Sequence, residues 1–327
     1  MRVGVVGVGS LGYHHVRLLR GVNGADLVGF FELRSDRAAE VSAELGVPAL
    51  ASFEALLDRC DAITVVVPTP AHHAVTRTAL DRGKHVLVEK PIASTLEEAD
   101  DLLDAARRAG VVMQTGHVER FNRAVRAALP YIDEPRFIES DRLAPFNPRG
   151  SDVAVVLDLM IHDIDLVRSL VGGPVRELAA VGVGVLTPSI DIANARLTFE
   201  RGSIANITAS RVSRERMRKL RIFQRSGYLS LDLAQGSGEF FRLRTDIDRT
   251  ALAQLPQQLE AFVERVALDA PAAEPLLLEL SSFIGAVRGE HPVVVSGEDG
   301  RDALDVALRI VAEIERTLPS VIGVAGA

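Results

Sequence analysis

The stretch VGVVGVGSLG, residues 3–12, decides the fold of the first half of the chain. Its apolar start predicts a buried strand, and Gly7, Gly9 and Gly12 form the pattern G-x-G-x-x-G, which opens a helix. Gly7 permits a tight turn, Gly9 lets a pyrophosphate approach the backbone, and Gly12 lets helix pack on strand. The helix is expected at Tyr13 to Leu19, and the free N–H groups at its amino end favour an anion. Ser10 and Leu11, within the loop, are further candidate cofactor contacts. The stretch therefore predicts a dinucleotide-binding βαβ unit.

A second predicted strand, Leu27 to Phe31, ends at Glu32, twenty residues beyond Gly12. An acid at this distance grips the ribose diol of a dinucleotide, and its charge repels a 2′-phosphate. NAD is therefore favoured over NADP. Arg34 and Arg37 weaken this preference, because arginines at this place can accept a 2′-phosphate, and Arg34 is itself a candidate cofactor contact.

Helical and extended stretches then alternate, which predicts right-handed βαβ units around a parallel sheet. We expect helices at 37–45, 52–59, 72–82 and 94–109, and strands at 61–67, 86–88 and 111–115. Pro68, Thr69 and His73 follow a strand and are predicted to line the nicotinamide side, since ligands bind at the carboxyl ends of such strands. For His73, packing at a helix end is an equal alternative.

HVLVEKPI, residues 85–92, places Glu89, Lys90 and Pro91 at the carboxyl end of another buried strand. A proline does not continue a central sheet ladder, so the chain leaves the sheet here. We expect Lys90 to be a fixed cation beside the cofactor, with Glu89 and Pro91 in the same turn. The plain alternative is a lysine at a strand end, in solvent.

Val153 to Val171 predicts an apolar helix whose polar exceptions include Asp158, His162, Asp165 and Ser169. Their spacing puts them on one helical face, and a solvent-facing stripe explains the spacing equally well. Asp158 and His162 lie one turn apart, so a carboxylate can orient an imidazole there. Histidine titrates near neutral pH and can take up an alcohol proton and return it.

The second half of the chain changes to extended segments. We expect strands at 136–143, 177–186, 192–199, 203–212, 220–223 and 229–233, followed by helices at 273–288 and 300–317. The segment Ser210 to Phe223 carries five arginines and a lysine against one acid, which suits an anion such as a diphosphate. Arg211 is the best candidate contact. A solvated hairpin is the competing interpretation.

Length and composition bound the possible functions. With 327 residues, two domains are expected, and the net charge of −7 argues against general nucleic-acid binding and against a membrane surface. Cys60 is the single cysteine, so an intrachain disulfide is impossible and a cytoplasmic location fits. The chain shows neither a leader, nor an apolar run of membrane length, nor metal-ligand spacing, so we predict a protein without a metal site.

Together these features resemble the Gfo/Idh/MocA oxidoreductases. The resemblance covers the glycine loop with Glu32, the Glu89-Lys90-Pro91 turn, the 117–122 segment and the pair Asp158 and His162. It implies a Rossmann domain, residues 1–118, and a second domain, residues 119–327, with an open, mainly antiparallel sheet. This sheet is expected to mediate homo-oligomers, either dimers or tetramers. Packing of the last helix against the first domain is compatible with these bounds. It also implies catalytic roles for Lys90, Asp158 and His162, with Pro91 able to be cis, and weaker substrate contacts at His117, Arg120, Asn122 and Arg211.

Phrases in the second half, such as 141–146, 156–163 and 191–196, also resemble the branch of this family that oxidises the 3-hydroxyl of UDP-N-acetylglucosamine for a 3-amino lipid A. The resemblance therefore implies an NAD(P)-dependent dehydrogenase acting on a sugar nucleotide. Two alternatives stay open. One is an inositol, free-sugar or sugar-acid dehydrogenase, and the other is a dinucleotide-binding regulator without catalysis.

Overall fold

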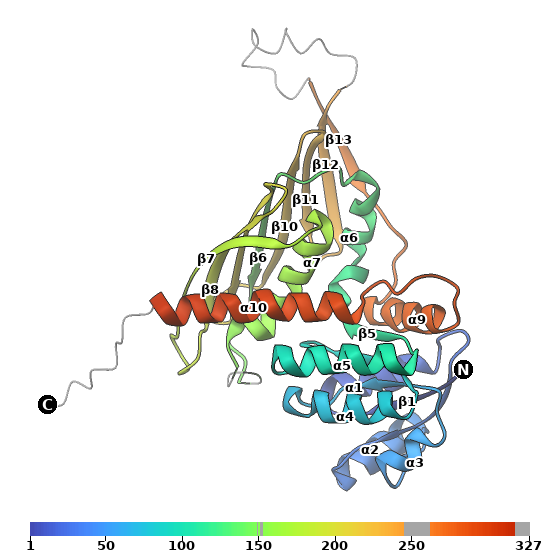
Figure 1. Ribbon diagram of the computed structural model, residues 1–327. Coiled ribbons are helices and arrows are strands. Elements are labelled where there is room, and N and C mark those ends of the chain that lie inside the picture. The colour runs from blue at the N-terminus through green and yellow to red at the C-terminus, as the bar shows by residue number, and fades with distance from the viewer. Residues whose placement is uncertain (149, 151–152, 245–261, 318–327) are drawn as a thin grey trace, which may run out of the picture. The chain divides into compact units, whose positions relative to one another are not determined.

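The computed structural model describes residues 1–148, 150, 153–244 and 262–317 (Figure 1). Two compact units share these residues. The first unit joins Met1–Phe121 to Ala273–Asp305, and the second joins Asn122–Ala272 to Val306–Ala327. The predicted domain boundary at residues 118 and 119 lies close to the break after Phe121. Residues 273–305, which the predicted boundaries place in the second domain, group with the first unit.

The first unit is built on a parallel sheet, as the alternating pattern predicts. Its strands run in the order β2-β1-β3-β4-β5 in the described part of the chain. The order reverses between β1 and β3, and open α/β sheets bind ligands at such a reversal, beyond the carboxyl ends of the strands. The strands are β1 (Arg2–Val6), β2 (Asp26–Phe31), β3 (Ala62–Val65), β4 (His85–Glu89) and β5 (Met113–Gly116).

Two helices of this unit, at 53–57 and 96–109, begin at a side-chain cap, Ser52 and Thr95 respectively. The Thr95 side chain accepts a hydrogen bond from the Glu98 N–H at 3.2 Å, and Glu98 accepts one from the Ser94 N–H at 2.9 Å. This reciprocal arrangement starts the helix at Leu96. The helices are α1 (Ser10–Leu19), α2 (Ser35–Leu45), α3 (Phe53–Leu57), η1 (Thr69–Ala71), α4 (His72–Asp81), α5 (Leu96–Ala109), η2 (Val118–Phe121) and α9 (Pro275–Val287).

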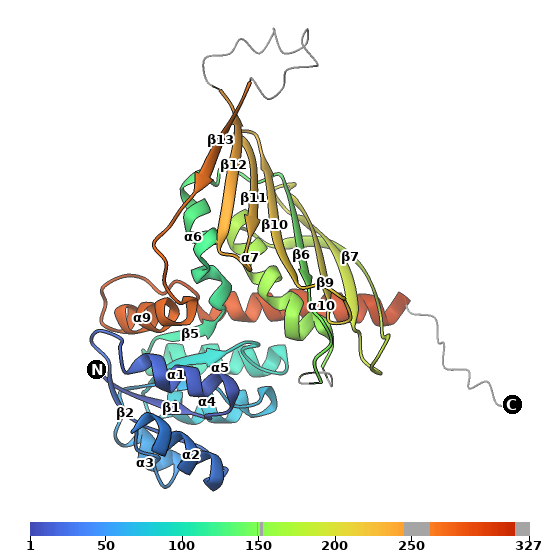
Figure 2. The same cartoon turned by 180° about the vertical axis from the view of Figure 1, so that it is seen from behind.

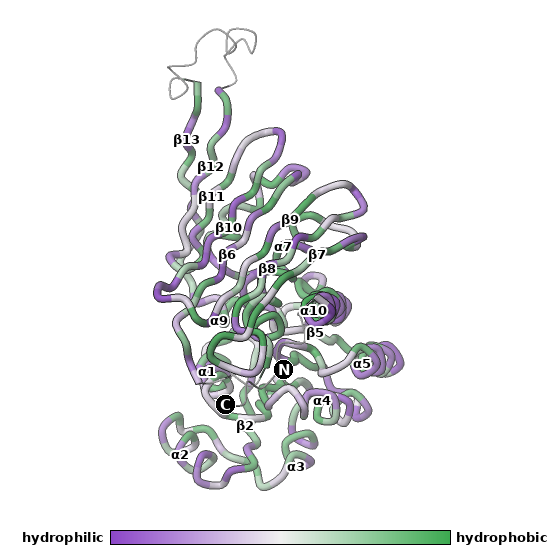
Figure 3. Tube along the Cα trace, turned by 90° about the vertical axis from the view of Figure 1, so that its left-hand side faces the viewer, coloured by the Kyte–Doolittle hydropathy of each residue, from purple (hydrophilic) through white to green (hydrophobic). Residues whose placement is uncertain are grey.

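Helix α9 belongs to the first unit because it completes that unit's core. Leu280, Phe283 and Ile284 of α9 are buried in one cluster with β1 and with Val16 and Leu19 of α1. Burying apolar side chains of this size contributes roughly 1.5–3 kcal/mol each. In the same unit, α4 and α5 carry their hydrophilic residues on the outside (Figure 3).

The second unit is built on a twisted sheet with the order β13-β12-β11-β10-β6-β9-β8-β7 in its described residues. All pairs are antiparallel except β6 with β9. Figures 1 and 2 show α6 and α7 on the same face of this sheet. The strands are β6 (Phe137–Leu143), β7 (Val175–Val183), β8 (Ile192–Phe199), β9 (Ile204–Ser210), β10 (Met217–Gln224), β11 (Gly227–Asp232), β12 (Ser237–Leu243) and β13 (Val263–Leu268).

The helix predicted over 153–171 forms later and less regularly than expected. Val153 is exposed, a π-helical stretch η4 (Val156–Met160) comes first, and α7 (Ile161–Val171) follows. Extra residues in a helical turn are often found at functional sites. The remaining helices are α6 (Arg123–Ala128), η3 (Leu129–Tyr131) and α10 (Gly297–Thr317), and α10 crosses from the first unit into the second.

Candidate active site

The glycine loop has the geometry that the sequence predicts. Gly7 has φ of +84°, and a side chain there would lie 2.6 Å from the Val66 carbonyl oxygen. A side chain at Gly12 would meet the Gly7 oxygen at 2.0 Å, so both glycines are obligatory. By contrast, nothing lies within 4 Å of the position that a Gly9 side chain would take. Open space at Gly9, ahead of the α1 N-terminus with Ser10 and Leu11, fits a pyrophosphate.

Glu32 lies beside this loop. Its Oε2 accepts the Val8 N–H at 2.9 Å, its Oε1 accepts the Arg34 N–H at 3.1 Å, and the Arg37 Nε donates to the Val8 oxygen at 2.9 Å. The carboxylate therefore lies against the backbone of the glycine loop, and Arg37 is directed to the same backbone. Arg34 Nε lies 3.6 Å from Glu32 Oε1, and the Arg34 side chain is 63% exposed. These residues fit a dinucleotide.

The turn after β4 rests on a buried carboxylate. His15 Nε2 of α1 lies 3.1 Å from Glu89 Oε1, and the Lys90 N–H donates to Glu89 Oε2 at 3.3 Å. Gly116 leaves room for this carboxylate, since a side chain there would lie 2.9 Å from it. Burial raises the pKa of Glu89, but the hydrogen bond and charge of His15, with Lys90 and His72, outweigh it and hold the pKa below its ordinary value. The Lys90–Pro91 peptide is cis.

His72, the first residue of α4, contacts this turn and was not singled out from the sequence. Its Nδ1 lies 2.7 Å from the Pro91 oxygen, and its Nε2 lies 2.9 Å from the Val67 oxygen. It therefore ties the turn after β3 to the turn that carries Lys90. Burial lowers the pKa of His72, against the opposing effects of the two carbonyls and Glu89. Its place just after a Pro-Thr-Pro turn was the available signal.

Pro68, Thr69 and His73 follow β3. Pro68 precedes η1, which begins at Thr69. The His73 imidazole lies 2.8 Å from Asp101 Oδ2 of α5, and Arg77 bonds the same carboxylate. The structure thus gives His73 a helix-to-helix contact, and its role toward a cofactor stays a prediction.

The segment after β5 holds three predicted substrate contacts. His117 is fully buried in the turn itself. Arg120 pairs with Asp299 at 3.3 Å, within the first unit. Asn122 belongs to the second unit, where its side chain caps α6 and donates to the Leu233 oxygen at 2.9 Å. Arg120 and Asn122 thus have structural partners, and the substrate roles of all three residues stay predictions.

Asp158 and His162 are both half-buried, with Asp158 in η4 and His162 in the first turn of α7. A side chain at Gly150, whose φ is +74°, would lie 3.2 Å from Asp158 Oδ2, so the backbone at Gly150 packs on this carboxylate. The neighbouring Asp163 is buried and accepts Arg142 Nε at 2.5 Å and the Ser140 hydroxyl at 2.9 Å. This buried pair fixes α7 against β6, and with it the helix that carries His162.

Arg211 is buried rather than open to solvent. It is 4% exposed, its Nη1 donates to the Gly150 oxygen at 2.6 Å, and its Nη2 donates to the Val153 oxygen. Two other cations of its segment have carboxylate partners. Lys219 pairs with Asp232 and Arg221 with Glu139.

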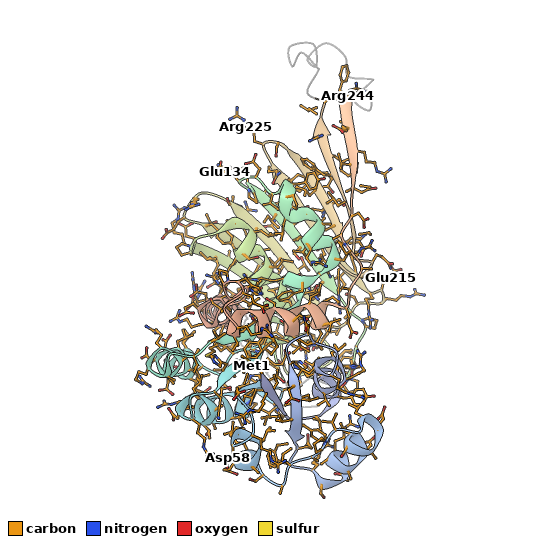
Figure 4. The ribbon with its side chains drawn as sticks, turned by 90° about the vertical axis from the view of Figure 1, so that its right-hand side faces the viewer. Met1, Asp58, Glu134, Glu215, Arg225 and Arg244 are labelled. Atoms are coloured by element: carbon orange, nitrogen blue, oxygen red, sulfur yellow. The ribbon has the colours of Figure 1, made fainter. Side chains whose placement is uncertain are left out.

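Two side chains near the ends of β10, one basic and one acidic, project from the surface of the second unit. Figure 4 shows Arg225 projecting from the turn between β10 and β11, and Glu215 projecting from the loop before β10. Arg211 as a substrate contact stays a prediction.

The described residues contain no group of three or more His, Cys, Asp or Glu side chains that could hold a metal ion. Among the same residues, no helix is long and apolar enough to cross a membrane.

A Rossmann unit with a dinucleotide loop, followed by a largely antiparallel sheet unit, defines a class of nicotinamide-dependent oxidoreductases. Residues 1–117 match the model described as oxidoreductase family, NAD-binding Rossmann fold, and residues 132–230 match the GFO/IDH/MocA C-terminal domain. The chain belongs to the Gfo/Idh/MocA oxidoreductase family. The expected family, fold class and enzyme class are thereby confirmed.

Two relatives and one solved structure are similar over nearly the whole chain. UDP-N-acetylglucosamine 3-dehydrogenase of Acidithiobacillus ferrooxidans is 37% identical over 97% of this chain and 98% of its own. Myo-inositol 2-dehydrogenase of Thermotoga maritima is 28% identical over 93% of each chain. A solved structure of the Acidithiobacillus enzyme has a TM-score of 0.88 at 36% identity, covering 97% of this chain and 98% of its own.

Proposed function

We propose that this enzyme oxidises the 3-hydroxyl of UDP-N-acetylglucosamine to the 3-keto sugar nucleotide. The observation that carries the proposal is the full-length similarity, in sequence and in structure, to the dehydrogenase of Acidithiobacillus ferrooxidans. The glycine loop, the Lys90 turn and the pair Asp158 and His162 supply the chemical groups that such a reaction needs.

The roles of the side chains follow from their chemistry. His162 accepts the proton of the substrate hydroxyl, because a neutral imidazole is a base near pH 7. Asp158 orients that imidazole and balances its positive charge. Lys90 stabilises the negative charge that develops on the reacting oxygen. When bound, the nicotinamide ring supplies the hydride acceptor.

We infer that NAD is preferred to NADP. Glu32 supports this preference, because its carboxylate beside Val8 would repel a 2′-phosphate. Arg34 Nε lies 3.6 Å from the same carboxylate and is the cation nearest to that charge, whereas Arg37 donates to the loop backbone. Gly7, Gly9 and Gly12 would hold the diphosphate, and the Glu89-Lys90-Pro91 turn, with Pro68 and Thr69, would lie toward the nicotinamide.

The test is absorbance at the reduced-nicotinamide band with NAD⁺ and UDP-N-acetylglucosamine. Free N-acetylglucosamine and myo-inositol run as matched controls, and mass spectrometry checks for the ketone. A duplicate contains a 2-oxo acid, so that tightly held NADH is recycled. Turnover with the nucleotide sugar alone supports the proposal. Turnover with a free polyol favours an inositol-type enzyme, and NAD binding without any turnover would favour a regulator.

We also propose that the enzyme forms homo-oligomers through the second unit. Four half-buried rings stack in a row on the sheet face opposite α7: Phe137, Phe223, Tyr228 and Phe241. Neighbouring centroids are 4.7–5.6 Å apart, and such aromatic surface suits an interface. Light scattering should give a dimer or tetramer, and Phe223→Glu should dissociate it. A monomeric wild type would contradict the proposal.

We also propose that the enzyme is cytoplasmic and that it acts on the route to a 3-amino lipid A. The buried Cys60, the single cysteine, fits a reducing compartment. We expect the enzyme to bind neither nucleic acid nor a membrane. Detection of the 3-keto product in cell extracts, and its loss when the gene is deleted, would test the pathway.

A further inference from the structure

Asp158 belongs to a segment whose backbone is irregular and depends on partners elsewhere in the second unit. The Asp158 N–H donates to the Ala154 oxygen at 3.2 Å, and the Val155 N–H donates to the Ile190 oxygen at 2.8 Å. Gly150 packs on the Asp158 carboxylate from the other side. The stretch is irregular although the Asp158 N–H keeps its bond to Ala154, so the contacts of Val155 and Gly150 help to fix where this carboxylate lies.

Arg211 provides further contacts to this segment. Its guanidinium donates to the carbonyl oxygens of Gly150 and Val153, both of which precede η4 in the chain. The planar fork of arginine suits two acceptors at fixed separation better than the single ammonium of lysine does. The side chain is 4% exposed, so the guanidinium lies in the protein interior and not in solvent.

Asp191 contacts Arg211 through both its backbone and its side chain. The Arg211 N–H donates to the Asp191 carbonyl oxygen at 3.0 Å, and Arg211 Nε lies 3.9 Å from Asp191 Oδ1. Asp191 is fully buried, and its carboxylate also accepts the N–H groups of Val185, Leu186 and Thr187. A buried anion placed in this way balances the buried cation.

We propose that Arg211 is a positioning residue for Asp158, acting through the Gly150 and Val153 carbonyls, with Asp191 as its anchor. This inference rests on the proposed function, in which Asp158 supports His162. It assigns Arg211 a different role from a contact to a substrate diphosphate. The two roles predict different kinetics, because a positioning residue changes kcat, whereas a diphosphate contact changes the KM of the nucleotide sugar.

The first experiment is a double-mutant cycle between Arg211→Met and Asp158→Asn, with Arg201→Met in an exposed turn as control. Arg211→Met should lower kcat by about 10- to 100-fold in the wild-type background. It should lower kcat by less than about 3-fold in Asp158→Asn, because the two residues act as one unit. Arg211→Lys should give intermediate values, and Arg201→Met should match the wild type.

The pH profile separates this role from general damage to the fold. A displaced Asp158 no longer stabilises protonated His162, so the acid limb of kcat should move to lower pH in Arg211→Met. Equal loss of kcat in both backgrounds would overturn the proposal. So would a raised KM for the nucleotide sugar with kcat unchanged.

A second measurement needs no substrate. Hydrogen exchange at the Val155 and Asp158 amides should be at least about 10-fold faster in Arg211→Met than in the wild type, while amides of α7 beyond Ile164 keep their rates. Unchanged exchange at both amides would overturn the proposal. If the wild type turns over none of the alcohols offered, the proposed function fails, and hydrogen exchange still decides the role of Arg211.

Discussion

Replacing Asp191 with asparagine should destabilise the second unit by about 2 kcal/mol at pH 7. One Asp191 oxygen accepts the N–H groups of Val185, Leu186 and Thr187 at 2.7–2.9 Å, and the other accepts the Thr187 hydroxyl at 2.8 Å. Burial raises the pKa of Asp191, but these bonds outweigh it and lower the pKa from 3.8 to about 2. At about 1.4 kcal/mol per pKa unit, the ionised form contributes about 2.5 kcal/mol.

The sign of the pH dependence follows from this depressed pKa. The folded state binds the Asp191 proton less readily than the unfolded state, so the stabilisation is complete above about pH 5 and is lost as the pH falls through 3.8 toward 2. About half of it should remain at pH 3. Asparagine resembles the protonated acid, so the difference between wild type and variant should shrink in the same range.

Urea unfolding followed by far-ultraviolet circular dichroism at pH 7, 4 and 3 measures this difference. Hydrogen exchange at the Val185, Leu186 and Thr187 amides localises it. Asp133→Asn, at an exposed aspartate of the same unit, is the matched control and should change stability little. An Asp191→Asn variant as stable as the wild type at pH 7, or a difference as large at pH 3 as at pH 7, would refute this reasoning.

The other predictions concern the first unit. Lys90→Ala should reduce turnover by at least about 100-fold with unchanged NAD binding by calorimetry, and full turnover would remove Lys90 from the chemistry. Glu32→Ala should weaken NAD more than NADP, and equal losses would contradict the ribose assignment. Thr95→Ala should cost about 1 kcal/mol by chemical unfolding, because the Glu98 N–H loses its cap, whereas Thr95→Ser should cost less. Because burial lowers the pKa of His72, stability should fall as the pH drops below about 6.5, and His72→Gln should flatten that slope; a parallel slope would refute it.

The first unit could be predicted closely because its signals are local. The glycine pattern, the acid twenty residues later and the Thr95 cap each determine geometry within a few residues of themselves. Local periodicity also predicted the helix that ends at residue 109 and, in the second unit, the strand 192–199. Two strands were not predicted, namely β12 and β13. Gly238 and Glu239 weaken the alternation of β12, and only the pairing with β11 and β13 makes it a strand.

The site was harder to predict because its supports are far apart in the sequence. His72 meets Pro91, Arg142 meets Asp163, and Arg211 meets Gly150. No periodicity reveals such pairs, since each depends on how strands are ordered in space. The arginine-rich segment shows the difficulty plainly. Its composition indicates an anion site, and two of its cations have carboxylate partners, Lys219 with Asp232 and Arg221 with Glu139. The anion site stays a prediction. The catalytic roles of Lys90, Asp158 and His162 stay predictions.

The grouping of Ala273–Asp305 with Met1–Phe121 has a consequence for biosynthesis. The nucleotide-binding unit is a discontinuous domain, and the sheet unit is largely an insertion within it. During translation, β1 to β5 leave the ribosome early, but α9, which buries Leu280 and Phe283 against β1 and α1, is made only after the whole inserted sheet. The nascent nucleotide-binding unit therefore has an uncovered apolar face during most of its synthesis, and chaperones that bind such surfaces would recognise it there.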